Sequence, residues 1–159
     1  MKIVDQRVQS AQIPVTLLLE DLLKRIEPRH LTGIRRIILL DRDCRRRKKP
    51  SIARYVPIRG TRTAEIELYM EHLLELPDRA RKNRIYLARY LLKALLHEIY
   101  HHRIRGLRTH RKPPDKKEEI DADRWASETM AEILSDRFGK EVFESEMKQI
   151  FRGGNKPEV

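Results

Sequence analysis

Cysteine occurs only once in the chain of 159 residues, as Cys44. A single thiol excludes an internal disulfide and fits a reducing cytoplasm. The sequence also lacks a signal-peptide profile and any apolar run of membrane-spanning length, so we expect a cytoplasmic protein. Asparagine and glutamine together number only six. This scarcity, beside many arginines and glutamates, is typical of proteins from thermophiles.

Positive charge is in excess, with a formal net charge of +11. The densest basic cluster is Arg45, Arg46, Arg47, Lys48 and Lys49. The cluster would bind nucleic acid through phosphates, recruit an acidic protein substrate, or simply form a solvated loop. The sequence leaves these three interpretations open, although no nucleic-acid-binding motif accompanies the cluster.

Hydrophobic residues make up 40% of the chain, enough for one domain with its own core. Hydrophobic periodicity predicts helices and strands in a mixed order. The expected elements are a helix over residues 14–26, strands over 34–40, 51–56 and 63–69, and a last helix over 140–151. Residues 1–13 and 152–159 are expected to be flexible tails. We therefore predict one α+β domain whose three-stranded meander packs on two further helices.

The first of those helices carries the most informative motif, His97-Glu98-Ile99-Tyr100-His101. Two histidines four residues apart leave one face of a helix, so both imidazoles can reach one metal ion. Glu98 lies beside them, where a carboxylate can act on a metal-bound water. The preceding sequence is apolar nearly all round, which predicts a central helix. Asp78 or Asn83 would cap its start.

A second helix is predicted to begin near Asp115, after a loop that contains His110. Glu119 and Asp123 lie four residues apart on one face of it. Glu119 would complete a three-ligand zinc site, and Asp123 would accept the free N–H of a bound histidine. His110 remains an alternative third ligand, whereas His102 is expected on the flank of the motif helix.

The combined pattern His97-Glu98-x-x-His101 and Glu119-x-x-Ala122-Asp123 resembles the gluzincin metallopeptidases. It is most similar to the minigluzincins and to the ImmA/IrrE group. The resemblance implies a zincin-like fold and zinc held by His97, His101 and Glu119. It also implies Glu98 as the general base, Asp123 as a partner of a ligand, and peptide hydrolysis as the activity.

Some features of larger relatives are absent. No histidine follows His110 to stabilise the transition state, and the strand at 63–69 lacks an asparagine that would hold substrate. Tyr55, Tyr69, Tyr100 and Arg124 remain candidates to stabilise an oxyanion. The same strand at 63–69 is the candidate edge to which an extended peptide would add.

The leading hypothesis is a zinc-dependent endopeptidase that acts on a peptide or protein. One alternative is a zinc protein that binds DNA or RNA through its basic loop. Another is a latent metallopeptidase whose cleft is closed by its own N-terminal or C-terminal tail.

Overall fold

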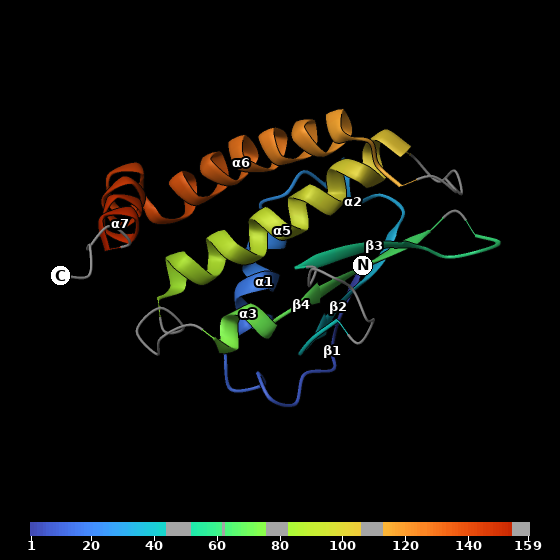
Figure 1. The fold of residues 1–159 in the computed structure, drawn as a ribbon, viewed down its shortest axis with the longest axis horizontal. Helices are drawn as coiled ribbons and strands as arrows, with labels where there is room; N and C mark the ends of the chain where they lie inside the picture. The colour runs from blue at the N-terminus through green and yellow to red at the C-terminus, as the bar shows by residue number, and fades with distance from the viewer. Residues whose placement is uncertain (44–51, 62, 76–82, 106–112, 154–159) are drawn as a thin grey trace.

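The structure is a computed structural model that describes residues 1–43, 52–61, 63–75, 83–105 and 113–153. The first half of the chain contains all four strands with short helices among them, and long helices fill the second half (Figure 1). In chain order the elements are β1 (Lys2–Asp5), α1 (Val15–Leu23), α2 (Pro28–Leu31), β2 (Ile34–Leu40), β3 (Ala53–Pro57), β4 (Ala64–Tyr69), α3 (Glu71–Leu74), α5 (Arg84–Arg105), α6 (Lys116–Phe138) and α7 (Lys140–Gly153). The predicted α+β class is confirmed.

The four strands form one mixed sheet in the order β1-β2-β4-β3. β1, β2 and β4 run parallel, and only β3 is antiparallel to its neighbour β4. The predicted three-stranded meander is therefore wrong, because β2 and β4 are adjacent and parallel. The prediction that residues 63–69 form an edge strand is also wrong. β4 is paired on both sides, and β3 lies at the edge.

The N-terminal segment contributes the other edge of the sheet. Lys2–Asp5 pairs with β2, so the prediction of a flexible tail over residues 1–13 is wrong there. Beyond the strand, Arg7 is buried and donates hydrogen bonds to the carbonyls of Ser10 and Ile13. This strand was missed in the sequence because four residues are too few to show an alternating pattern. β1 and β3 are therefore the two edge strands of the sheet.

One face of the sheet is apolar and the other carries charge. Alternate residues of β2 and β4, such as Ile37 and Ile66, are fully buried in a core shared with α1 and α5. Their neighbours on the opposite face form ion pairs, including Arg36 with Glu65. The period of two along each strand therefore sets which face the helices cover.

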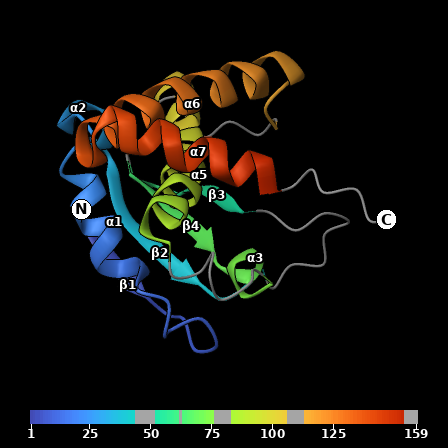
Figure 2. The same ribbon diagram turned by 90° about the vertical axis from the view of Figure 1, so that its left-hand side faces the viewer.

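Helix α5 lies in the centre of the domain, as its sequence predicted. Figures 1 and 2 show it between the sheet and α6. Seven of its apolar residues are at most 1% exposed: Leu87, Ala88, Leu91, Leu92, Leu95, Leu96 and Ile99. The Asn83 side chain caps its start by accepting the backbone N–H groups of Ile85 and Tyr86, both at 3.0 Å. The predicted Asn83 cap is confirmed.

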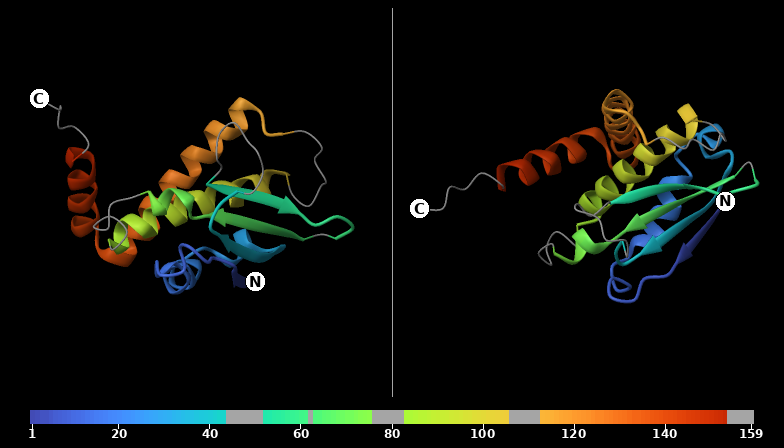
Figure 3. Two further views of the ribbon diagram at one scale, coloured as in Figure 1. Left: turned by 60° about the horizontal axis from the view of Figure 1, so that its bottom comes forward. Right: turned by 45° about the vertical axis from the view of Figure 1, so that its right-hand side comes forward.

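Helix α6 begins where the sequence predicted, with the Asp115 carboxylate accepting the backbone N–H of Glu118 at 2.8 Å. It ends at Gly139, whose φ of +83° is accessible to glycine but strained for other residues. The chain then turns into α7, which projects away from α6 (Figure 3). The buried side of α6 packs on α5, so one helix pair holds both halves of the expected ligand set.

Some predictions fall on residues outside the described ranges. These are Asp78, the third-ligand alternative His110, residues 154–159 of the predicted C-terminal tail, and the basic cluster Arg45, Arg46, Arg47, Lys48 and Lys49. The first two residues of that tail, Arg152 and Gly153, belong to α7, so the prediction of a flexible segment is wrong there. Among the described helices, none combines the length and the apolarity needed to cross a bilayer.

Candidate metal centre

Three predicted ligands from two helices come together in the structure. The Nε2 atoms of His97 and His101 are 3.1 Å apart. Glu119 of α6 places one carboxylate oxygen 3.2 Å from the first of these atoms and the other oxygen 3.5 Å from the second. His101 is buried, His97 is 19% exposed at its side chain, and Glu119 is more open to solvent. The group can hold a metal ion.

The outer nitrogen of each imidazole also meets a carboxylate. Nδ1 of His97 lies 3.0 Å from Asp123, as predicted, and Nδ1 of His101 lies 2.7 Å from Glu118. A carboxylate acceptor assigns the imidazole proton to Nδ1, which leaves a lone pair on Nε2. Two Nε2 lone pairs and the Glu119 carboxylate thus face one another at 3.1–3.5 Å. Lone pairs at this distance repel one another, and a shared cation would remove the repulsion. The donor set therefore fits a metal ion.

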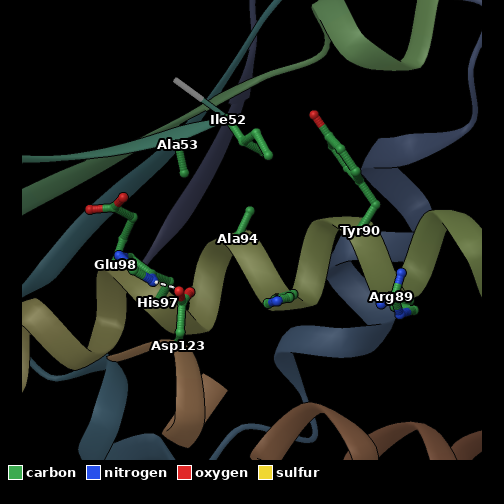
Figure 4. A pocket seen from close by; sticks show the side chains of 9 residues that line it. Ile52, Ala53, Arg89, Tyr90, Ala94, His97, Glu98 and Asp123 are labelled. Atoms are coloured by element: carbon green, nitrogen blue, oxygen red, sulfur yellow. Dashed lines mark hydrogen bonds and ion pairs between the residues drawn. The ribbon is translucent and has the colours of Figure 1, made fainter. Parts of the chain in front are cut away.

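Glu98 follows His97 in the sequence and lies on a different side of α5. Its side chain is directed toward strand β3, away from Asp123 (Figure 4). Burial raises the pKa of the Glu98 carboxyl above its usual value, while nearby His97 and His101 and a hydrogen bond from the Tyr55 backbone N–H oppose that shift. The Tyr55 contact shows that the outer edge of β3 faces Glu98.

A cavity of about 500 Å³ lies beside His97 and Glu98. One wall comes from Ile52 and Ala53 at the start of β3, and Asp123 of α6 contributes to the rim (Figure 4). The α5 residues that line it are Arg89, Tyr90, Lys93, Ala94, His97 and Glu98. Its volume is in the range of small-molecule and peptide side-chain sites. The candidate metal centre therefore adjoins, through His97, a cavity large enough for a small molecule.

His102 is not part of the ligand group, in agreement with its predicted flank position. It is 6% exposed, and both ring nitrogens have other partners. Nε2 donates to the Thr32 carbonyl at 2.7 Å, and Nδ1 accepts from the Tyr55 hydroxyl at 3.1 Å. The side chain therefore links α5 to β3 and to the turn before β2.

None of the four predicted oxyanion residues lines the cavity. The Tyr55 hydroxyl is bound to His102, and the Tyr69 hydroxyl donates to Glu67. Tyr100 packs against His101 and Trp125, and Arg124 is exposed near Asp121. The cavity instead presents Tyr90, whose hydroxyl donates to the Tyr69 carbonyl at 3.3 Å and whose pKa is raised by burial.

Two parts of the site were missed by sequence reasoning. One is Glu118, which meets Nδ1 of His101. This contact depends on how α6 crosses α5, and the sequence singles out only its neighbour Glu119. Lys93 and Arg89 lie four and eight residues before His97, so their shared helical face was the available signal. Both roles depend on which faces the packed helices expose to the cavity.

No protein-family model matches the sequence, and neither a curated protein nor a solved structure matches it. The likeness to gluzincins consequently stays a prediction from the double motif. The geometry of His97, His101 and Glu119 is the independent observation that bears on a metal.

Proposed function

We propose that the protein is a zinc-dependent metallopeptidase of the gluzincin type. The observation that carries the proposal is the convergence of His97, His101 and Glu119 beside a cavity that Glu98 also lines. Tetrahedral zinc with bonds of about 2.0–2.1 Å separates its ligand atoms by about 3.3 Å. The two histidine nitrogens are 3.1 Å apart, and each has a Glu119 oxygen within 3.5 Å, so the three side chains are close enough to share one ion. Two imidazoles and one carboxylate are a ligand set that catalytic zinc takes.

Each residue then has a separate role. His97, His101 and Glu119 would hold the ion, while Asp123 and Glu118 fix the orientation of the two imidazoles. When bound, zinc supplies Lewis acidity, which polarises a carbonyl and lowers the pKa of a water. Glu98, which lines the same cavity as His97, would accept a proton from a water and pass it to the leaving amine.

Strand β3 is the element that would hold the peptide backbone. It lies at one end of the strand order, and the Tyr55 N–H on its outer edge already reaches Glu98. Within the described residues no strand pairs with that edge. A peptide that adds to β3 through main-chain hydrogen bonds would pass directly over Glu98. This assignment replaces the earlier expectation for residues 63–69.

The experiment separates metal binding from proton transfer. The wild-type protein and the Glu98→Gln variant, purified without a metal-affinity tag, are incubated with zinc, desalted and analysed for metal content. Both should retain zinc, because Glu98 is not one of the three ligands. Only the wild type should cleave peptides in a random library, because the amide cannot accept a proton.

Glu128→Gln is a matched control, since it removes one exposed carboxylate from α6 away from the ligand group. It should keep both zinc and cleavage. Retained cleavage by Glu98→Gln would exclude Glu98 as the base. Failure of the wild type to take up zinc would refute the metal centre itself.

A further inference from the structure

The cavity floor consists of two adjacent rows of side chains along α5. Residues four apart in a helix lie above one another on one face. Tyr90, Ala94 and Glu98 form the row that faces β3, as Figure 4 shows. Arg89, Lys93 and His97 form the neighbouring row. The second row therefore runs from two cationic side chains directly to the first metal ligand.

Charge is separated along the length of the cavity. Its acidic residues, Glu98 and Asp123, are both at the end that contains His97. Its basic residues, Arg89 and Lys93, are both toward the start of α5. Both basic side chains are half-buried, so their charges act in a partly desolvated setting where electrostatic attraction is strengthened.

Another acidic group near the basic end is Glu75, whose charge acts on the Tyr90 hydroxyl. Glu75 does not line the cavity, and it forms a 3.8 Å ion pair with His72. Among the residues that the structure describes, the cavity lining at this end is therefore basic and apolar, with Tyr90, Ala94 and Ile52 beside the two cations.

We propose that Lys93 and Arg89 bind a carboxylate of the peptide substrate, two to four residues from the bond that is cleaved. Four residues of α-helix rise about 6 Å, and an extended peptide advances about 3.3 Å per residue. Lys93 is thus about two peptide residues from His97, and Arg89 is about four. The carboxylate belongs to an aspartate or glutamate side chain or to the C-terminus of the peptide.

This assignment rests on the proposed peptidase function, because the metal centre fixes where the cleaved bond lies. It adds a substrate class to that function. The two cations attract an acidic side chain or a C-terminal carboxylate to this end of the cavity, whereas they repel a basic side chain there. The net charge of +11 also favours acidic partners over basic ones.

The test uses random octapeptide libraries made with free C-terminal carboxylates and again as C-terminal amides. The zinc-loaded full chain digests each library, and mass spectrometry locates the cleaved bonds. If a side chain supplies the carboxylate, Asp and Glu are enriched about tenfold over Asn and Gln at one position two to four residues from the cleaved bond, in both libraries. If the C-terminus supplies it, the amide library is cleaved about tenfold more slowly.

The variant Arg89→Gln/Lys93→Gln should lose this preference for charged over neutral peptides. The matched control Lys2→Gln/Arg35→Gln removes the same two charges from exposed positions on β1 and β2. It should keep the preference, which distinguishes the cavity from the general positive charge of the protein. Equal preference in both double variants would overturn the assignment to Arg89 and Lys93.

A binding arm separates this proposal from the proposed function. Zinc-loaded Glu98→Gln protein is mixed with the same libraries, and the retained peptides are sequenced. Selective retention of carboxylate-bearing peptides, without cleavage by the wild type, supports the carboxylate site and refutes the peptidase. Cleavage without any preference for carboxylates refutes the site and leaves the peptidase standing. Neither cleavage nor selective retention refutes both.

Discussion

His101 and His102 are consecutive residues of α5, and both are buried. Each ring nitrogen of both side chains lies close to a polar atom. Their surroundings differ in the kind of partner. His102 donates to the Thr32 carbonyl and accepts from the Tyr55 hydroxyl, so every lone pair meets a proton. His101 donates to Glu118, but its other nitrogen faces His97 and Glu119, which both present lone pairs.

The difference shows how a structural histidine is distinguished from a ligand. A buried polar cluster is stable when donors and acceptors match, and the surroundings of His102 satisfy that condition. The group around His101 contains an excess of acceptors, which only a cation or an added proton can balance. Burial alone therefore says little about function, whereas an excess of converging acceptors indicates a metal site.

The largest expected effect is on zinc content, when His101 and His102 are each replaced by alanine. His101→Ala should lose zinc, because two remaining ligands cannot hold the ion against dialysis. His102→Ala should keep zinc, because its nitrogens face Thr32 and Tyr55 instead. Metal analysis after dialysis checks both variants, with circular dichroism to establish that each one is folded. Equal zinc content in the two folded variants would remove the distinction between them.

Glu118→Gln should give the next largest effect. The carboxylate accepts from Nδ1 of His101, and replacing it with an amide weakens the charge-assisted hydrogen bond that orients the ring. Loss of such partners typically reduces metal affinity by about 10–100-fold. Competition with a zinc chelator measures the affinity, and Glu128→Gln on the exposed side of α6 is the control. An unchanged zinc affinity in Glu118→Gln would mean that Glu118 does not position His101.

Much of the fold could be predicted because it depends on local pattern. The strand over Ile34–Leu40 and the central helix follow directly from hydrophobic periodicity, and Asn83 and Asp115 are recognisable caps. Strand order depends on contacts between distant segments, which periodicity does not report. The short strand β1 and the position of β4 between β2 and β3 therefore emerged only from the structure.

The candidate site shows the same division. His97, His101 and Glu119 were predictable because metal ligation imposes a fixed spacing on a helix and a second helix near it. Asp123 was predictable as one turn beyond Glu119. Glu118 was not, because its role depends on the angle at which α6 crosses α5, and sequence alone does not give that angle.

His102 should prove to be a structural residue when measured without metal. His102→Leu removes the donor to the Thr32 carbonyl and the acceptor for the Tyr55 hydroxyl, which costs about 1–3 kcal/mol of unfolding free energy. His102→Gln is the sharper comparison, because its amide nitrogen can still donate where Nε2 did, so it should lose less. Urea denaturation in a chelator gives both values. Equal losses would mean that the Thr32 hydrogen bond contributes nothing.

The smallest effect concerns a polar cluster far from the metal centre, at the end of β1. The hydrogen bond from the Arg7 side chain lowers the pKa of Asp5 to about 2, and a further bond from Thr16 adds to it against the effect of burial. Because the folded-state pKa is below the unfolded value of about 4, the stabilisation is fully present above pH 4 and is lost as the pH falls toward 2. Asp5→Asn should therefore lower the urea midpoint at pH 7 but reduce its further fall between pH 4 and pH 2. Parallel pH profiles for the variant and the wild type would contradict this expectation. They would point instead to Asp41, whose pKa is also lowered, because hydrogen bonds from Ser10, Gln9 and Val8 outweigh the raising effect of burial.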